Sequence, residues 1–354
     1  MRIGIDAHAL TGKRQGSRTW LLNVLRHLSP SVHGHELFVY SFDPDQAATL
    51  VGSHGYHHRP LPDGPAIARL LWHLPRAAFT DRLDVLLMQY QIAPFCPCQQ
   101  VVVIHDVLFE SQPAWFPPAM RWRLRLGCRY SAWRAKRVVT VSEFSRQEIA
   151  QRYHIAPERI VVAPNAAEPA RHSDEVARAR VRALGRFLLC VGRLEPRKNI
   201  ALAIRASAAA RTAGIRLVIV GRHEDWAPLL TVTGLNIVHI PEADDALLEA
   251  LYEGALALIY PSVGEGFGLP VIEALRAGTP VLCSNTTALP EVGGHLASYF
   301  DPCATDAEAE LATMIAAAFR KPRRLDPELV ASHLKGFDWC ASANAVARAL
   351  TSAG

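Results

Sequence analysis

The stretch from position 260 to 273 reads Y-P-S-V-G-E-G-F-G-L-P-V-I-E, and it decides how the rest of the chain is interpreted. An apolar strand is expected to end at Tyr260, where a glycine-rich loop follows. Pro270 suits the first turn of a helix that Gly278 then caps. Glycines let a ligand approach the backbone closely, and free amide groups at a helix start favour phosphate. The stretch therefore predicts an anion site at the carboxyl end of a strand.

Two carboxylates accompany this predicted site. Glu265 lies in the loop, and Glu273 lies about one turn into the helix, from where it can point back at the same ligand. Carboxylates beside an anion site suit hydroxyl donors such as a sugar ring and a ribose better than phosphate itself. The alternative is an ordinary turn between strand and helix with solvated glutamates, and an isolated glycine loop would favour it.

A second motif makes that alternative less favourable. Positions 191–199 read V-G-R-L-E-P-R-K-N after the apolar run 187–191, which places Arg193 and Lys198 in another strand-to-helix loop. A guanidinium and an ammonium group there can neutralise a departing diphosphate. Basic residues in such loops are usually solvated, but beside the glutamate-containing loop they predict a donor site for a phosphorylated substrate.

Short apolar runs alternate with helical patterns along the chain, which indicates an α/β fold with doubly wound parallel sheets. The gap between two series of strands, positions 164–186, is where we expect an interdomain hinge. The predicted strands are Arg2–Asp6, Leu37–Ser41, Val85–Met88, Val101–His105, Val138–Val141 and Ile160–Ala163, then Phe187–Val191, Arg216–Val220, Ile237–Ile240, Ala257–Tyr260 and Pro280–Cys283.

Composition narrows the class of protein. A chain of 354 residues suggests two domains, and half of its residues are hydrophobic, as in ordinary globular proteins. The charge is unevenly distributed. Residues 1–170 contain 19 Lys/Arg and 13 Asp/Glu, a net charge of +6, whereas the rest of the chain has a net charge of −1, which gives the total of +5. No apolar run is long enough to span a bilayer, and the start reads as a strand rather than a signal peptide. The seven cysteines are expected to be reduced thiols in a cytoplasmic protein.

Together these motifs resemble the retaining glycosyltransferases of family 4, which have the GT-B fold of two facing Rossmann-like domains with a central cleft. The resemblance covers nearly the whole chain and is most specific from Phe187 to Pro302. It implies an acceptor-binding domain over 1–168, a hinge over 169–186 and a nucleotide-sugar domain over 187–338. A C-terminal helix over 339–354 is expected to complete the first domain.

The resemblance also implies roles for individual residues. Arg193 and Lys198 would bind the donor diphosphate, Glu265 the transferred sugar and Glu273 the ribose. The loop at Pro241 would contact the base through its backbone. The residues with implied catalytic roles are His105, Arg193, Lys198 and Glu265, and those that would bind the donor are Gly16, Gly192, Arg193, Lys198, Pro241, Glu265, Gly266, Phe267, Gly268, Leu269 and Glu273.

In the amino-terminal half, V-I-H-D at 103–106 resembles the family segment whose histidine faces the donor sugar. His105 at a strand end can orient a sugar hydroxyl, and a structural pair with Asp106 is the alternative. Ser142 is interpreted as the cap of the next helix. Gly16 is the best match to the family's phosphate-approaching glycine, although the glycines of this loop are separated.

The stretch from Arg121 to Arg137 contains seven basic residues and no acid. On a helix, its aromatic residues would lie at an anionic membrane surface while its arginines contact headgroups. The alternative is a surface helix whose aromatic residues face the core. No recognised nucleic-acid module accompanies the patch, so nucleic acid is not an expected partner.

The resemblance implies transfer with retention, and no carboxylate in the matched motifs has an obvious nucleophile position. We therefore expect a front-face reaction dominated by stabilisation of the leaving diphosphate. No acidic D-x-D site accompanies the motif, so neither a metal nor another cofactor is expected. The resemblance favours GDP-mannose or a related GDP-hexose as donor, with UDP- and dTDP-sugars as alternatives, and a lipid-linked saccharide as acceptor. A non-catalytic sugar-nucleotide sensor stays open. A nicotinamide oxidoreductase does not fit, because the first turn lacks G-x-G-x-x-G.

Overall fold

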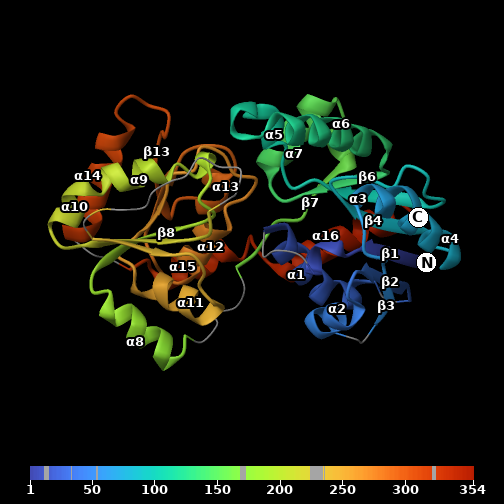
Figure 1. Ribbon diagram of the computed structural model, residues 1–354, viewed down its shortest axis with the longest axis horizontal. Coiled ribbons are helices and arrows are strands. Elements are labelled where there is room, and N and C mark those ends of the chain that lie inside the picture. The colour runs from blue at the N-terminus through green and yellow to red at the C-terminus, as the bar shows by residue number, and fades with distance from the viewer. Residues whose placement is uncertain are drawn as a thin grey trace. The chain divides into compact units, whose positions relative to one another are not determined.

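The structure is a computed structural model, and it describes residues 1–11, 16–32, 34–52, 55–167, 173–223, 234, 236–320 and 324–354. The chain divides into two compact units. Unit 1 consists of Met1–Asn165 and Phe337–Gly354, and unit 2 consists of Ala166–Gly336. Each unit is built around one sheet in which every pair of neighbouring strands is parallel, and helices pack against it (Figure 1).

The sheet of unit 1 has the strand order β3-β2-β1-β4-β5-β6-β7. Its strands are β1 Arg2–Asp6, β2 Glu36–Ser41, β3 Tyr56–Pro60, β4 Val85–Gln89, β5 Gln99–Val103, β6 Arg137–Thr140 and β7 Ile160–Val162. The longer helices of this unit are α1 Gly16–Ser31, α2 Pro44–Val51, α4 Leu74–Thr80, α6 Pro118–Arg134, α7 Glu143–Tyr153 and α16 Trp339–Thr351. The shorter ones are η1 His8–Thr11, α3 Ala66–Ala68, the π-helical turn η2 Arg69–His73, α5 Leu108–Ser111, η3 Pro113–Trp115 and η4 Pro157–Arg159.

The sheet of unit 2 has the order β10-β9-β8-β11-β12-β13. Its strands are β8 Phe187–Val191, β9 Arg216–Val220, β10 Ile237–Ile240, β11 Leu258–Tyr260, β12 Val281–Ser284 and β13 Ala297–Phe300. Its helices are α8 Glu175–Ala183, η5 Pro196–Lys198, α9 Ile200–Ala206, α10 Ala208–Thr212, α11 Asp245–Gly254, α12 Leu269–Arg276, α13 Leu289–Gly293, α14 Ala307–Arg320 and α15 Pro327–Leu334. Residues 169–186, where the sequence predicts a hinge, include α8, which packs on α11. Residues 168–172 lie outside the described part of the chain.

All the predicted strands are present, with bounds that differ by two residues at most, and two strands were not predicted. Both of these, β3 and β13, lie at an edge of their sheet. The sequence of β3 is Y-H-H-R-P and only Tyr56 is buried, while in β13 only Phe300 is buried. Edge strands do not need the continuous apolar run that a strand covered on both faces needs, and so they carried no recognisable pattern.

The helix α16 returns the chain to unit 1 and packs on α1, with further contacts to β7 and β6 (Figure 1). The side chains of Ala343, Val346 and Leu350, spaced for one helical face, are all buried. The Ser342 hydroxyl donates a hydrogen bond to the carbonyl of Pro164 at 2.6 Å. The predicted C-terminal helix is therefore an integral part of the core of unit 1.

Candidate active site

The carboxyl ends of the strands of unit 2 lie at one edge of its sheet, because all of its strands run parallel. Two glycines bring the ends of β8 and β9 together there. Gly221 has φ +148°, and a Cβ at this position would lie 2.0 Å from the carbonyl oxygen of Gly192. The amide of Leu194 then donates to the carbonyl of Arg222 at 2.8 Å. The loop that carries Arg193 and Lys198 is thus held against the neighbouring strand end.

Lys198 is buried at the end of the short helix η5, with 8% of its surface exposed. Its Nζ donates hydrogen bonds to Glu265 Oε1 at 2.6 Å and to the Tyr260 hydroxyl at 2.8 Å. Burial lowers the pKa of Lys198 below its usual value, and the charge of Glu265 partly offsets this. Two of the residues predicted for the donor site, one from each motif, are therefore in direct contact.

Glu265 is the acceptor at the centre of this contact. Its Oε1 also accepts from the Ser262 hydroxyl at 2.5 Å and the Tyr260 hydroxyl at 3.0 Å, and its Oε2 accepts from Arg197 Nη1 at 3.0 Å. Burial alone would raise the pKa of Glu265, but Lys198 and Arg197 outweigh burial and lower it to about 2. Glu265 is thus ionised at neutral pH, and both of its oxygens are engaged.

The loop after Glu265 leads into α12 as the sequence predicts. Gly268 has φ +107° and precedes the first helical residue, Leu269, and a Cβ on Gly268 would lie 2.7 Å from Leu289 Cδ2. The side chain of Phe267 is buried, with 5% of its surface exposed. A donor-binding role for Gly266, Phe267, Gly268 and Leu269 therefore falls to backbone amides rather than to side chains.

The remaining predicted residues of unit 2 lie around this cluster. Glu273 is partly buried on α12, and its Oε2 accepts a hydrogen bond from the Tyr252 hydroxyl at 2.8 Å. The side chain of Arg193 is 38% exposed, and its Nη2 lies 4.0 Å from Glu195 Oε2. Pro241 is exposed directly after β10. Arg193 and Glu273 thus keep exposed surface beside a buried ion cluster.

His105 and Gly16 belong to unit 1. His105 follows β5, is 7% exposed, and its ring contacts those of Trp20 and Tyr90 at centroid distances of 5.5 and 5.6 Å. Its Nε2 is buried and has no hydrogen-bond partner among the described residues. Burial lowers the pKa of His105 to about 4, so the ring is neutral at pH 7. Gly16 begins α1, and residues 12–15 before it lie outside the described residues.

Two polar residues near His105 begin helices of unit 1. The Ser142 hydroxyl accepts from the amide of Ser145 at 3.1 Å, which confirms Ser142 as the cap of α7. The carboxylate of Asp106 accepts from the amide of Leu108 at 3.1 Å, at the start of α5. The ring of His105 instead contacts the aromatic rings of Trp20 and Tyr90.

Sequence reasoning overlooked several members of the cluster in unit 2. Arg197 bridges Glu265 to Glu195, whose Oε1 lies 2.6 Å from Arg197 Nη2. The Thr287 hydroxyl, in the segment between β12 and α13, accepts a hydrogen bond from the amide of Glu265 at 2.9 Å. Arg197 and Glu195 lie inside the quoted motif, so their position next to Lys198 was a usable signal. Thr287 is 22 residues from Glu265, and only the fold brings it near.

Within the described ranges, no group of three or more His, Cys, Asp or Glu side chains is arranged to hold a metal ion. The same ranges contain no helix that is both long and apolar enough to cross a bilayer.

Comparison with known proteins identifies the class to which this architecture belongs. Residues 14–171 match the family described as Glycosyltransferase Family 4, and residues 177–325 match the family described as Glycosyl transferases group 1. The two matches together include most of the chain. The chain therefore belongs to family 4 of the glycosyltransferases, and its two parallel sheets match the GT-B fold, as the motifs predict.

Individual relatives agree with this assignment. The chain is 31% identical over 236 residues to O-antigen chain mannosyltransferase B of Escherichia coli, a match that covers 58% of each chain. Its fold resembles that of a sucrose-phosphate synthase from Thermosynechococcus elongatus, with a TM-score of 0.75 over 100% of both chains at 18% identity. It also resembles HepE of Anabaena in complex with UDP-glucose, with a TM-score of 0.75 over 99% of this chain and 100% of that chain at 17% identity.

Proposed function

We propose that the protein is a retaining glycosyltransferase that moves a hexose from a nucleotide diphosphate sugar to a saccharide acceptor. The observation that carries the proposal is the buried cluster of Lys198, Arg197 and Glu265 beside the start of α12. With Arg193 at its edge, the cluster contains three cations and the two carboxylates of Glu265 and Glu195, which leaves a positive excess at a strand end where backbone amides also converge. A departing diphosphate develops negative charge, and fixed cations and amides stabilise such charge strongly in a dry site.

In the proposed reaction, the bond between the anomeric carbon and the diphosphate oxygen breaks, and its electron pair leaves with the diphosphate. Arg193, Lys198 and the amides that precede α12 stabilise that leaving group. The acceptor oxygen bonds to the same face of the anomeric carbon and passes its proton to the departing phosphate oxygen. Glu265 fixes the positions of Lys198 and Arg197, and a sugar hydroxyl would bind it by replacing the Ser262 or Tyr260 hydroxyl. His105, which is neutral, would orient a hydroxyl of the sugar.

The donor that we favour is GDP-mannose or a related GDP-hexose. The name of the Escherichia coli relative, an O-antigen chain mannosyltransferase, supports mannose. UDP- and dTDP-sugars are the alternative, and HepE, whose complex contains UDP-glucose, supports a uridine nucleotide instead. In either case Glu273, whose Oε2 accepts a hydrogen bond from Tyr252, would bind the ribose, and the backbone at Pro241 would contact the base.

A thermal-shift panel of GDP, UDP, dTDP and ADP tests this proposal. A nucleotide that binds only the folded chain raises its melting temperature, and we expect the largest rise with GDP. The rise should disappear in Lys198→Ala and persist in Arg205→Ala, whose side chain pairs with Glu308 on the exposed surface. A flat response of the wild-type chain to all four nucleotides would refute the donor site. Hydrolysis of the donor without acceptor-dependent transfer would favour a nucleotide-sugar sensor.

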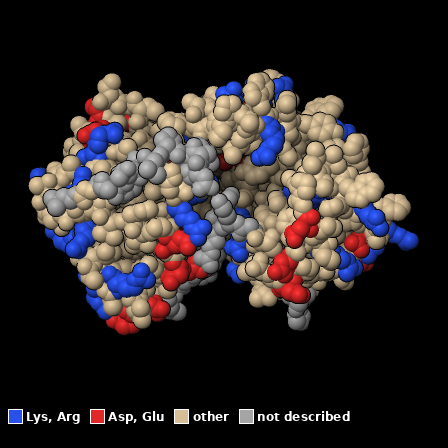
Figure 2. All heavy atoms as spheres, in the orientation of Figure 1, with Lys and Arg blue, Asp and Glu red and all other residues tan. Residues whose placement is uncertain are grey.

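The acceptor that we propose is lipid-linked, and α6 supports contact with an anionic membrane. Its residues Trp122, Leu126, Tyr130 and Trp133 form one helical stripe and are 44–66% exposed, so they do not face the core. Arg121 and Arg125 flank Trp122, with guanidinium carbons 5.9 and 5.3 Å from its ring centroid. Basic side chains lie among uncharged ones on this part of the surface (Figure 2). Sedimentation with anionic but not neutral vesicles would support peripheral binding, and equal sedimentation would contradict it.

A further inference from the structure

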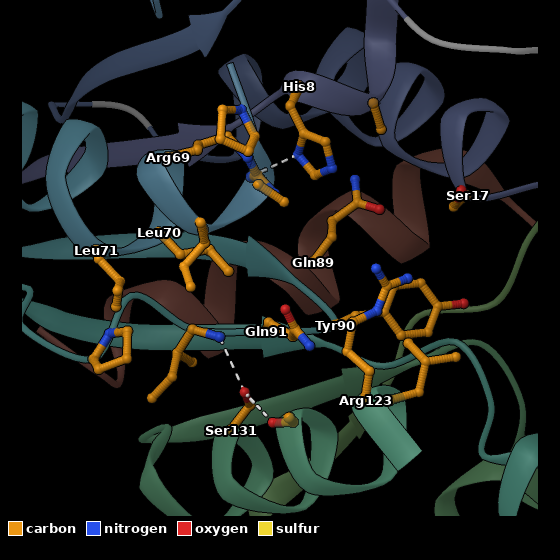
Figure 3. A pocket seen from close by; sticks show the side chains of 18 of the residues that line it. His8, Ser17, Arg69, Leu70, Leu71, Gln89, Tyr90, Gln91, Arg123 and Ser131 are labelled. Carbon is orange, nitrogen blue, oxygen red and sulfur yellow. Dashed lines mark hydrogen bonds between the residues drawn. The ribbon is translucent and has the colours of Figure 1, made fainter. Parts of the chain in front are cut away.

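A pocket of about 1030 Å³ lies within unit 1 (Figure 3). Gln89, the last residue of β4, lines it, and the exposed apolar side chains of Ile67, Leu71 and Tyr130 form its rim. The segment that joins β4 to β5 contributes further lining residues, the last of which is Pro94. A change in the shape of this segment therefore changes the wall of the pocket.

The first part of the segment is fixed by buried hydrogen bonds. The Ser131 hydroxyl of α6 accepts from the amide of Ile92 at 3.0 Å, as a dashed line in Figure 3 shows. The buried side chain of Gln100 accepts from the amide of Ala93 at 2.8 Å and donates to the carbonyl of the same residue at 2.9 Å. Residues 92 and 93 are thus held to α6 and β5, and the part of the segment that can change shape is 94–98.

This second part contains the C-x-C motif, and it turns both thiols inward. Phe95, Pro97 and Gln99 are exposed, whereas Cys96 and Cys98 between them are partly buried and pack against the hydrophobic core of unit 1. The proline ring fixes its own φ and restricts the backbone of the preceding cysteine, so few conformations are open to the stretch between the thiols. The motif is therefore held with both cysteine side chains on its inner side.

The two thiols are close to bonding distance. The sulfur atoms of Cys96 and Cys98 lie 3.4 Å apart. In a disulfide they would lie about 2.05 Å apart, so closing the bond requires an approach of about 1.4 Å. The five other cysteines are Cys128, Cys190 and Cys283, which are buried, and Cys303 and Cys340, which are exposed.

The two thiols also differ in acidity. The hydrogen bond from the Cys98 thiol to the Cys96 sulfur lowers the pKa of Cys96, although burial opposes this. The same hydrogen bond and burial raise the pKa of Cys98. A disulfide bond is attacked by a thiolate and not by a thiol. Cys96 is therefore suited to attack an external disulfide, and Cys98 is suited to resolve the intermediate.

We propose that Cys96 and Cys98 are a site of reversible oxidation, at which a low-molecular-weight disulfide such as oxidised glutathione closes the C-x-C motif to an intramolecular disulfide. This inference does not depend on the proposed transferase function. A ring closed between residues only two positions apart is small, and strained disulfides are readily reduced. The pair thus acts as a thiol–disulfide switch rather than as a structural bond, which agrees with the expectation of reduced thiols under reducing conditions.

The oxidation proceeds by two exchanges. The thiolate of Cys96 attacks one sulfur of oxidised glutathione, whose S–S bond breaks, and one glutathione thiolate leaves with the electron pair. Cys98 then loses its proton and attacks the sulfur of Cys96, and the mixed disulfide breaks to release the second glutathione thiolate. The dithiol is oxidised by two electrons, and its two protons pass to the two glutathione thiolates.

Closure changes the wall of the pocket. The fixed residues 92 and 93 lie on one side of the stretch 94–98, and β5 begins at Gln99 on the other, so the change is confined to this stretch. Pro94 lines the pocket, and Phe95 beside it is 74% exposed. The redox state of the two thiols therefore sets the shape of the pocket at Pro94.

Treatment of the native full chain with oxidised glutathione tests the proposal, with the remaining thiols alkylated and the peptides identified by mass spectrometry. We expect the peptide that contains the motif to lose the mass of two hydrogen atoms, and dithiothreitol to restore it. In Cys98→Ser the reaction should stop at a glutathione adduct on Cys96. In Cys96→Ser the remaining thiol of the motif should react about tenfold more slowly than Cys96 does. Cys303→Ser, which removes an exposed cysteine of unit 2, is the matched control and should form the disulfide like the wild type.

Hydrogen exchange of the reduced and oxidised chains measures the effect on the pocket. We expect exchange in the stretch 94–98 to change by about tenfold or more while exchange in β4 stays the same. Closure no faster in the native chain than in urea would overturn the proposal, because the fold would then not hold the two thiols together. Glutathione adducts without closure would also overturn it. Identical exchange in the reduced and oxidised chains would refute the effect on the pocket.

Discussion

The ion cluster of unit 2 and the strand ends of unit 1 differ in how their buried polar groups are satisfied. In unit 2, Lys198 and Arg197 both donate to Glu265, and hydroxyl groups of Ser262 and Tyr260 complete the cluster. In unit 1, Gln89 and His105 each bury a nitrogen that has no partner among the described residues. Unit 1 also bears nearly all of the large exposed hydrophobic residues of the described chain.

This contrast indicates how the two candidate sites would be used. A closed ion cluster keeps its geometry without a ligand, so it is preorganised for a group that is the same in every reaction cycle. The proposed occupant, a diphosphate, is such a group. Unpartnered nitrogens beside an apolar rim instead acquire their partners only when a ligand arrives. Each of the following predictions alters one side of this contrast.

The largest expected effect follows the loss of the central cation of unit 2. Lys198→Ala should lower kcat/KM for transfer by about 10²–10³-fold, because a fixed donor to the leaving group is removed. Arg197→Ala should cause a smaller loss, since in the proposed reaction Lys198 stabilises the leaving group whereas Arg197 acts through Glu265. Steady-state transfer rates provide the measurement, with Arg205→Ala as the unaffected control. Equal losses in the Arg197 and Arg205 variants would show that the cluster does not act as a unit.

A smaller effect is expected on the stability of unit 1 when the pH is lowered, because His105 is buried in its neutral form. The pKa of His105 is lowered from its usual 6.5 to about 4, so the unfolded chain binds the proton more readily. The contribution of neutral His105 to the free energy of unfolding is fully present above about pH 6.5 and is lost as the pH falls towards 4. Between pH 7.5 and 4.5 it should diminish by about 2.5 kcal/mol. Urea unfolding of the wild type and His105→Gln at both pH values measures this, and an equal pH dependence of the two proteins would contradict it.

The smallest effect is expected where a single hydroxyl group orients Glu273, the residue proposed to bind the ribose of the donor. Tyr252→Phe removes the hydrogen bond to Glu273 Oε2 and keeps the buried ring. One neutral-to-charged hydrogen bond of this kind should raise KM for the donor about 3- to 10-fold with little change in kcat. Tyr299→Phe, which removes a hydrogen bond to the carbonyl of Gly294, is the control within the same unit. A fall in kcat with unchanged KM would assign Tyr252 to the chemical step instead.

The central strands and the loops at their carboxyl ends were predictable from the sequence, because strands covered on both faces leave continuous apolar runs. The motif at 191–199 also predicted correctly that Lys198 lies at a strand end, and the contact with Glu265 connects it to the second motif. The edge strands β3 and β13 were not predictable in this way, since few of their side chains are buried.

The pocket of unit 1 could not have been read from the sequence. Asp6, Arg69 and Gln89 belong to three separate segments, and only the order of the sheet places β1 beside β4. Arg69 lies in a π-helical turn, whose spacing differs from the helical period used in sequence analysis. The exposure of Trp122 and Trp133 likewise follows from which face of α6 packs inward, and it is Cys128, Ser131 and Ala132 that do so.

The return of α16 to unit 1 has a consequence for biosynthesis. The surface of α1 that α16 covers cannot be buried until residues 337–354 have emerged from the ribosome, after the whole of unit 2. At typical elongation rates of about 5–20 residues per second, synthesis of residues 166–354 takes roughly 10 to 40 s. Unit 2, whose segment is continuous, can fold during that interval, whereas unit 1 waits with an open core. Newly made chains would therefore depend on chaperones chiefly for unit 1, most of which is translated before unit 2.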